Sequence, residues 1–439
     1  MKTLAFIAVL LLSLCAGCAR VSVVKHLDAQ ASAAPSDALV EASERVRVSA
    51  EGLNAAEPAL AAGRDGAVYV AWVGHGAGKE ADVWLTRIAD ASGRPVGEPA
   101  RVNPRPGEAT AWRGDAPSVA VLAEGAVYVA WTARAGEGGQ ATTLYVSCSR
   151  DGGRSFGEPA RVNDDSAPGV HGMHSLAVGS DGRVYVAWLD ERDHAAAQDG
   201  AHAPGQASGR MPMHGEHNRE VFFSYSTDGA RTFAANRRVA AEACPCCKTS
   251  LAVSVDGRVY VGWRQVLPGD FRHIAVASSA DGGETFDAPT VVSDDRWELR
   301  GCPVSGPALA AGEGGRLTVL WFTAGDAGAA GLYSAESGDG GRTFAPRRAV
   351  SEVGARGTPQ LLRDASGAFA VFEAEGEGGS PAMFEARLDE AERDAARATS
   401  NRRTRIGAGA LPVAAVLGGR IYAAYVSNGG VWLTSYKAG

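Results

Sequence analysis

The sequence predicts an all-β fold: a β-propeller of antiparallel four-stranded blades, with seven blades expected and six as the alternative. Three observations lead to this prediction. One strand–strand–strand–turn–strand unit recurs along the 439 residues, its second strands are apolar on both faces, and a lone N-terminal strand can complete the last unit. A closed array of repeats can form one domain of this size, so we expect a single propeller domain over residues 45–439.

The second strand of each unit carries the strongest signal. It is an apolar run that ends in an aromatic side chain, and it recurs at similar intervals except where an insertion at residues 190–219 separates two copies. Polar residues do not alternate with apolar ones, which is typical of a strand buried on both faces, as in stacked blades. The runs are Val68–Trp72, Val127–Trp131, Val184–Trp188, Val259–Trp263, Leu317–Trp321, Phe369–Phe372 and Ile421–Tyr425.

A turn with the pattern Ser-x-Asp-Gly-x-x-Ser/Thr-Phe follows the third strand in four units. Its aspartates are Asp151, Asp228, Asp281 and Asp339. Such an aspartate can accept hydrogen bonds from backbone amides of the turn, while glycine adopts a positive φ and the aromatic side chain packs into the blade. The pattern resembles the Asp-box of the bacterial neuraminidase repeat, found in sialidases and other propellers. The resemblance implies a structural role for these residues, on the face away from an active site.

Closure of the ring can also be predicted. Only three strands are visible in the last unit, which ends at Val431–Tyr436, whereas the strand Arg45–Ser49 precedes the first full unit. Pairing of this strand with the last blade would supply a fourth strand and remove an open sheet edge. Sialidases, which the turns resemble, have six blades, so seven blades would be a departure from that family.

The N-terminus has the features of an export signal. Lys2 is followed by the apolar run Leu4–Leu14, which is too short to span a membrane as a mature helix. The run ends at Cys15-Ala16-Gly17-Cys18, which resembles the lipobox of bacterial lipoproteins, although leucine is usual where Cys15 stands. The resemblance implies a signal peptide over residues 1–18, acylation of Cys18 and, because Ala19 follows, anchoring to the outer membrane. The alternative is an ordinary signal peptide cleaved near Ala19.

The composition of the sequence indicates a tether and limits the expected classes of partner. Residues 19–44 are polar and rich in alanine and serine, which is typical of a flexible tether. The net charge is −7, the pI is about 5.8, and no basic stripe is present, which excludes nucleic acid as an expected partner. The partners that remain are the membrane, through the lipid anchor, and a glycan or a protein. No phosphate-binding loop, Ser/His/Asp motif or dinucleotide motif is apparent.

Cysteine, histidine and methionine gather in the part of the sequence that should border the central funnel. Six of the nine histidines and three of the five methionines lie between residues 171 and 217. The cysteines Cys244, Cys246, Cys247 and Cys302 lie in connections that enter neighbouring inner strands, and so do His171 and His174. The insertion adds Met211, Met213, His214 and His217.

Two interpretations of this cluster remain open. Thiolate, thioether and imidazole ligands together suit copper or zinc, and the Met-x-Met-His run favours copper. In an exported chain, however, cysteines usually form disulfides, so Cys302 can bridge to Cys244, Cys246 or Cys247. The segments around these cysteines also resemble those of bacterial proteins named sialidase-like.

The resemblance to sialidases implies three arginines for a substrate carboxylate, a tyrosine nucleophile paired with glutamate, and an aspartate as acid and base. These residues do not transfer to this sequence one by one, because the first blade opens with Glu57-Pro-Ala-Leu60 in place of the family's Arg-Ile-Pro segment. Arginine is suited to bidentate carboxylate binding. The weak catalytic candidates at the funnel are Arg113, Asp115, Asp190, Glu191, Arg264, Arg300 and Arg356, and salt-bridged or solvated charges are the alternative for each.

The sequence therefore supports three hypotheses for function. The first is a cell-envelope lipoprotein that acts as a binding module, with a metal or disulfide site at its funnel. The second is a glycoside hydrolase of sialidase type that acts on sialic-acid-like glycans. The third is a scaffold for protein–protein interaction. Fold alone does not distinguish them, since propellers host many activities.

Overall fold

The computed structural model describes residues 38–78, 80–89, 93–110, 114–136, 141–166, 168–192, 217–301, 303–352, 355–388 and 403–438. All of them belong to one compact unit, Asp37–Gly439. Apart from the short 3₁₀ helix η1 (Glu377–Gly379), the elements with defined bounds in these ranges are strands. No helix among these residues combines the length and the apolar character that crossing a membrane requires. The predicted signal peptide, Cys18 and most of the predicted tether lie outside the described residues.

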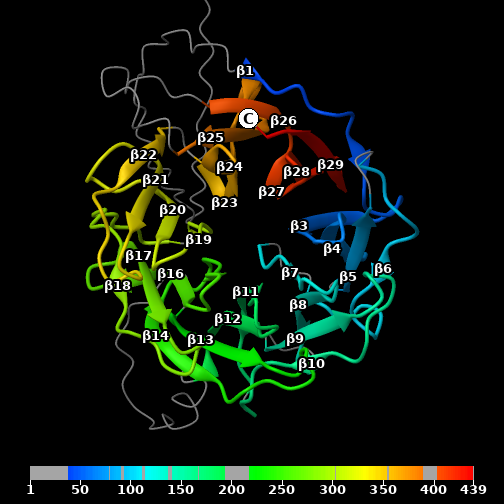
Figure 1. Cartoon of the computed structure of the whole chain (residues 1–439), viewed down its shortest axis with the longest axis horizontal. Helices are drawn as coiled ribbons and strands as arrows, with labels where there is room; N and C mark the ends of the chain where they lie inside the picture. The colour runs from blue at the N-terminus through cyan, green and yellow to red at the C-terminus, as the bar shows by residue number, and fades with distance from the viewer. Residues whose placement is uncertain are drawn as a thin grey trace, which may run out of the picture. The chain divides into compact units, whose positions relative to one another are not determined.

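The strands form antiparallel four-stranded sheets arranged around a centre (Figure 1). Each sheet runs from an inner strand through two long strands to an outer strand. Two sheets are joined through the single pair Ala243↔Gln265, and a fifth strand, β1 (Ala38–Leu39), pairs in parallel with β26 (Arg403–Ala408) at the edge of another. The arrangement is the all-β propeller of antiparallel four-stranded blades that the sequence predicts, and that prediction is confirmed.

The inner strands contact one another in chain order, and the last contacts the first. These strands are β3 (Asn54–Ala62), β7 (Ser118–Val121), β11 (His171–Val178), β15 (Ser250–Val253), β19 (Ala308–Ala311), β23 (Ala355–Asp364) and β27 (Ala410–Leu417).

The second strand of each sheet is the most deeply buried. Trp72, Trp131, Trp188, Trp263 and Trp321 end the apolar runs predicted from sequence, and each has less than 2% of its surface exposed. Each indole N–H reaches a side-chain oxygen, as in Trp131 Nε1 to Ser147 Oγ at 3.0 Å, so burial leaves no donor unsatisfied. The strands are β4 (Val68–His75), β8 (Val127–Arg134), β12 (Val184–Asp190), β16 (Val259–Leu267), β20 (Leu317–Thr323), β24 (Gly367–Glu375) and β28 (Arg420–Ser427).

The third and outer strands complete the sheets. The third strands are β5 (Ala81–Ile88), β9 (Thr142–Ser149), β13 (Arg219–Ser226), β17 (Phe271–Ser279), β21 (Gly331–Ser337), β25 (Pro381–Arg387) and β29 (Gly430–Lys437). The outer strands are β6 (Ala100–Arg101), β10 (Ala160–Arg161), β14 (Arg237–Ala243), β18 (Thr290–Val291), β22 (Arg348–Ser351), β26 and β2 (Val46–Arg47).

Strand β2 closes the ring. It pairs with β29 in the register Val46↔Leu433, and the backbone amide of Val48 donates to Val431 O at 2.9 Å. The N-terminal segment therefore supplies the outer strand of the last sheet, at the position expected for residues 45–49.

The four turns at Ser149–Phe156, Ser226–Phe233, Ser279–Phe286 and Ser337–Phe344, here called the aspartate turns, share one geometry. In the first, Asp151 Oδ1 accepts from the Ser155 amide at 3.0 Å and from Ser149 Oγ at 2.7 Å, while Oδ2 accepts from Ser155 Oγ. Burial is the largest single influence and opposes ionisation, but these bonds together outweigh it and lower the pKa of Asp151 to about 2. The bonds repeat at Asp228, Asp281 and Asp339.

The aspartate turns also join neighbouring blades. Gly153 has φ +82°, and a Cβ at this position would lie 2.6 Å from Leu85 Cδ2 and 3.3 Å from Tyr69 in the preceding blade. Only glycine satisfies both the backbone angle and the close approach. None of the four aspartates lines the cavity described below.

Candidate functional site

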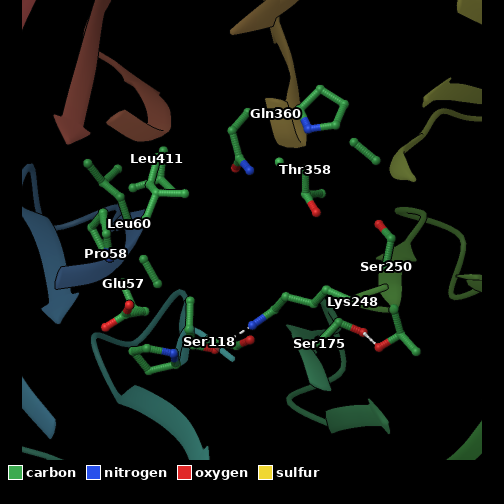
Figure 2. Close-up of a pocket in the computed structure, with 18 of the residues that line it drawn as sticks. Glu57, Pro58, Leu60, Ser118, Ser175, Lys248, Ser250, Thr358, Gln360 and Leu411 are labelled. Carbon is green, nitrogen blue, oxygen red and sulfur yellow. Dashed lines mark hydrogen bonds between the residues drawn. The ribbon is translucent and has the colours of Figure 1, made fainter. Parts of the chain in front are cut away.

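A cavity of about 330 Å³ lies at the centre of the ring. Every inner strand contributes to its wall, and Figure 2 shows side chains from these strands facing one space. Among the described residues that line it, Glu57 and Lys248 are the ionisable ones, and the rest are apolar or carry hydroxyl or amide groups. The contributing segments are Glu57–Leu60, Ser118–Val119, Ser175–Leu176, Lys248–Leu251, Ala308–Leu309, Thr358–Leu361 and Leu411–Val413.

Lys248 brings a positive charge to the cavity. It lies on the segment that leads into β15, and its ammonium donates to the backbone carbonyl of Ala116 (Figure 2). Part of the side chain is accessible from the cavity, yet burial lowers the pKa of Lys248 to about 8, against the opposing effect of the nearby Asp115 carboxylate. The amine is therefore mostly protonated at neutral pH.

Asp115 and His174 support Lys248 from behind the cavity wall. Asp115 accepts from the Met173 amide at 2.8 Å and from Thr132 Oγ1 at 3.1 Å, and its Oδ1 lies 3.5 Å from His174 Nδ1. Burial tends to raise the pKa of Asp115, but the neighbouring His174 and the charge of Lys248 lower it overall. Burial and the Lys248 charge lower the pKa of His174. Asp115 thus provides the negative charge that offsets Lys248.

Glu57, the other ionisable residue of the wall, already has a partner. Its Oε2 atom lies 2.5 Å from His75 Nε2, and the residue is only 3% exposed. The backbone at Glu57 has φ +48°, a conformation that L-residues seldom adopt, so the position is held by its surroundings.

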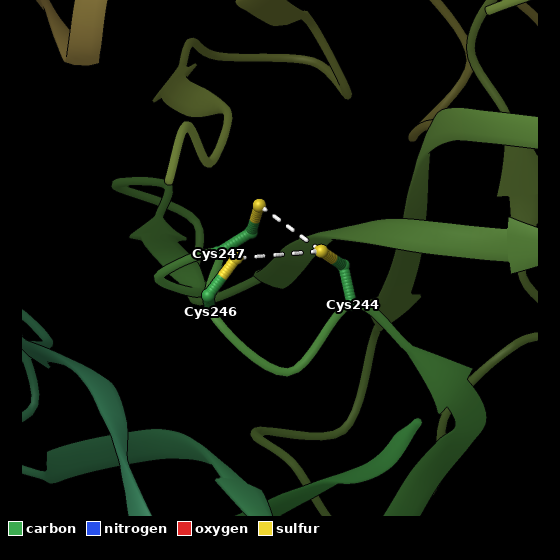
Figure 3. Close-up of side chains that lie close together, drawn as sticks. All are labelled: Cys244, Cys246 and Cys247. Atoms are coloured by element: carbon green, nitrogen blue, oxygen red, sulfur yellow. Dashed lines mark hydrogen bonds between the residues drawn. The ribbon is translucent and has the colours of Figure 1, made fainter. Parts of the chain in front are cut away.

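The cysteines expected at the funnel form a tight turn beside this wall. Cys244, Cys246 and Cys247 follow β14, and their sulfur atoms all lie within 4.8 Å of one another (Figure 3). All three cysteines belong to one buried apolar cluster, and Cys246 also lines the cavity. Cys246 is disulfide-bonded, and Cys148, Cys244 and Cys247 are free thiols, so the partner of Cys246 is not among the described cysteines.

The predicted histidine ligands do not join this group. Within the described ranges, the three cysteines alone form a cluster with the spacing of metal ligands. His171 instead lies in a buried polar network, with Nδ1 2.6 Å from Thr142 O and Nε2 3.1 Å from Asp165 Oδ1. His174 Nε2 lies 3.0 Å from Ala130 O, on the side away from Asp115. His217 is exposed.

The acidic candidates have structural partners. Asp190 is fully buried and accepts from Trp188 Nε1 at 2.8 Å and from Arg192 Nε and Nη2 at 3.0 and 2.8 Å. Glu191 pairs with Arg219 at 2.7 Å. Both carboxylates therefore hold the end of β12 and the start of β13 in place, and neither lines the cavity.

The arginine candidates are dispersed. Arg264 is fully buried under Trp297, with Nε and Nη2 donating to Ser305 O and Phe322 O, both at 2.9 Å. The Arg300 and Arg356 side chains are 81% and 52% exposed and pair loosely with surface carboxylates. None of the three lines the cavity, so they do not form a carboxylate-binding cluster there. Arg113, Met211, Met213, His214 and Cys302 lie outside the described residues.

Two features of the site were not predicted from the sequence. Lys248 directly follows the cysteine run and lies just before an inner strand. This position in the sequence could have identified it as a residue of the cavity wall. Cys244 and Cys247 also have the C-x-x-C spacing that is typical of redox-active pairs. Chemically, the arrangement offers a cation for an anionic ligand and, next to it, a disulfide beside two thiols.

No protein-family model and no curated protein sequence matches the chain. A Dyadobacter fermentans protein of unknown function is similar at 17% identity and a TM-score of 0.48, over 79% of this chain and 98% of that one. The Hadza microbial sialidase Hz136 is similar at 14% identity and a TM-score of 0.47, over 82% and 74%. A Penicillium chrysogenum alpha-L-arabinanase is similar at 11% identity and a TM-score of 0.46, over 80% and 99%.

Proposed function

We propose that the protein is a binding module of the cell envelope that holds a small, polyhydroxylated carboxylate in its central cavity. The observation that carries this proposal is that Lys248 lines a cavity walled by every inner strand. A carboxylate at Lys248 would gain a charge-assisted hydrogen bond in a partly desolvated site. Hydroxyl and amide groups such as Ser250 and Gln360 line the same space and suit the remaining polar groups of a sugar (Figure 2).

Binding is favoured over hydrolysis because the described wall lacks the groups that hydrolysis needs. Glycosidases generally use two carboxyl groups, or in sialidases a tyrosine nucleophile. The described lining residues include one carboxylate, Glu57, which is paired with His75, and no tyrosine. Lys248 alone can bind and orient a carboxylate but cannot both protonate a leaving group and activate water.

The cell envelope is the proposed setting because of the N-terminal sequence and the state of Cys246. Residues 1–18 have the pattern of a lipoprotein signal peptide, with Cys18 as the residue to be acylated. A disulfide at Cys246 fits an oxidising compartment outside the cytoplasm.

Titration calorimetry with sialic acid, a uronic acid and the matching neutral sugar tests the proposal. We expect the acidic sugars to bind and the neutral sugar not to bind, and Lys248→Met to weaken binding by about tenfold or more. Lys437→Met, which removes an exposed lysine on β29, is the matched control and should leave binding unchanged. Because only the protonated amine binds an anion, affinity should be steady below pH 8 and fall as the pH rises above it.

Equal affinity for the neutral sugar, or an unaffected Lys248→Met variant, would contradict the proposal. Turnover of a fluorogenic sialoside by the purified protein would instead support the hydrolase alternative.

A further inference from the structure

The inner strands carry aliphatic side chains at one common level of the cavity. Six of the seven inner strands formed by the described residues have leucine or valine at this level, and β27 has Ala414. Each position pairs with the residue two places before the aromatic end of the second strand, as in Leu251↔Val261 before Trp263. All six aliphatic residues line the cavity. We call them the aliphatic belt: Leu60, Val119, Leu176, Leu251, Leu309 and Leu361.

The lining of the cavity changes from polar to aliphatic along these strands. The residue before the belt position is serine or glutamine in four strands, and these residues line the cavity (Figure 2). The residue after the belt position is alanine in five of the six belt strands, and no described residue at that position lines the cavity. The cavity therefore has a polar level and ends at the belt. The four polar residues are Ser118, Ser175, Ser250 and Gln360.

The protein core holds the belt residues in place. Each is partly exposed, and each packs against a different buried cluster of the propeller. Leu309 illustrates how closely they pack. A Cβ at Gly262, where the three preceding copies of the strand have alanine, would lie 3.1 Å from Leu309 Cδ1 and 3.3 Å from its Cδ2. The aliphatic surface is therefore preformed, as is usual for ligand pockets.

An aliphatic surface at the end of a cavity favours an apolar group of a ligand. Covering this surface removes apolar area from water, and each methylene that becomes buried raises affinity by about fourfold. Single exposed aliphatic residues are ordinary in proteins, but the belt repeats one at the same level of inner strands that contact one another. The repetition favours a binding surface over incidental exposure.

Lys248 and the belt can contact the same ligand. Lys248 lies three residues before Leu251, so the two are separated by at most about 10 Å along the chain. Ser250 lies between them in the sequence and also lines the cavity. A ligand with its carboxylate at Lys248 can therefore place its hydroxyl groups at the polar level and a short apolar group on the belt.

We propose that the aliphatic belt selects ligands that carry a short alkyl group in addition to a carboxylate. The ligand class is then an acidic sugar with an alkyl substituent, in which the charge is bound by Lys248 and the alkyl group by the belt. The inference rests on the function proposed above, because it assigns the second half of the same ligand.

Titration calorimetry of the full-length mature protein with two pairs of glycosides tests the inference. The pairs are methyl and butyl β-D-glucuronide, which carry the carboxylate, and methyl and butyl β-D-glucoside, which do not. We expect butyl glucuronide to bind about tenfold or more tightly than methyl glucuronide, because its three additional methylenes become buried.

Two belt variants locate the effect. Leu251→Ala and Leu361→Ala change the belt in blades that are not neighbours, and each should reduce the ratio of butyl to methyl glucuronide affinity by about threefold. Leu39→Ala is the matched control, because Leu39 on β1 is 70% exposed and does not line the cavity. This variant should leave the ratio unchanged.

Equal affinity of the wild-type protein for the two glucuronides would overturn the inference and leave the proposed function standing, and this comparison needs no variant. The inference would also fail if Leu411→Ala, which changes a lining leucine outside the belt, reduced the ratio and the two belt variants did not.

The glucosides separate this inference from the proposed function. If both butyl compounds bind equally tightly, and more tightly than the methyl compounds, the belt is supported and the role of Lys248 is contradicted. If none of these glycosides binds, both proposals are wrong.

Discussion

The aspartate turns and the inner wall both contain buried or hydrogen-bonded ionisable groups. The partners of these groups are close in sequence in the turns and distant in sequence at the inner wall. In an aspartate turn, the carboxylate of Asp228 bonds to groups at most four residues away, as in the 2.6 Å bond from Thr232 Oγ1. At the inner wall, Asp115 meets Met173, 58 residues away, and Lys248 reaches Ala116, 132 residues away. The first kind of site forms with its own repeat, whereas the second exists only when several blades are in place.

This difference explains why the candidate functional site lies at the inner wall and not at the aspartate turns. In a locally satisfied turn, the carboxylate is already occupied by hydrogen bonds from its own turn and has little capacity left for a ligand. The inner wall has a lysine that lines the cavity and a thiol beside a disulfide-bonded cysteine, because neighbouring blades hold groups there that no local bond satisfies. Such groups lower the stability of the fold, and they are expected where a protein binds a ligand or carries out a reaction.

The largest effect on stability should come from Asp115→Ala. This change leaves the buried Met173 amide without its acceptor and Lys248 without its nearby counter-charge, so we expect the free energy of unfolding to fall by about 3–5 kcal/mol. Urea denaturation measures the loss. Arg300→Ala, which removes an 81% exposed side chain, is the control and should change stability by no more than about 0.5 kcal/mol. Similar losses of unfolding free energy in the two variants would contradict the expected difference between the inner wall and the surface.

The next effect is a pH dependence at the cysteine turn. The pKa of Cys244 is about 6 in the folded state, below its usual value of 9.0, so the unfolded state binds more protons between these values. Stability contributed by Cys244 should therefore increase as the pH rises from 6 to 8.5, by roughly 1 kcal/mol per pH unit at most, and be lost as the pH falls through 6. The measurement is the difference in unfolding free energy between wild type and Cys244→Ser across this range. A constant difference would show that Cys244 is not ionised in the folded protein.

The smallest effect should come from the aspartate turns. Asp151→Ala and Asp281→Ala each remove local hydrogen bonds at the surface, and we expect each to lower stability by about 1 kcal/mol. Because the two turns belong to blades that are not neighbours, and the two carboxylates have no hydrogen-bond partner in common, the double variant should show the sum of the two losses within about 0.5 kcal/mol. The losses of stability caused by substituting Asp115 and Lys248 should not be additive in this way. Coupling between the two turns would mean that they are linked through the intervening blade.

The same contrast determines what the sequence could predict. The runs such as Val68–Trp72 and the turns such as Ser149–Phe156 were predictable, because their signals are local and repeat. The pairing of β2 with β29 followed from a count of strands and the need to cover an edge.

The contacts of the inner wall were not predictable, because they join residues from different blades. The sequence suggested that His171 and His174 gather with the cysteines, yet each is held by groups on neighbouring strands, as in the contact of His171 with Asp165. Arg264 looked like a ligand for a substrate carboxylate, but it is buried under Trp297 beside the thiols. Contacts between sheets leave no local signal in the sequence from which they could be predicted.

The pairing of β2 with β29 also sets the order in which the molecule can be completed during synthesis. Ser49 Oγ accepts from the Val431 amide at 3.1 Å, a bond between residues 382 positions apart. Until β29 has been made, β28 has no partner on one side, and β2 has no strand to pair with. The ring therefore closes only after translation of the whole domain, so a truncated or stalled chain presents an open sheet edge to other chains.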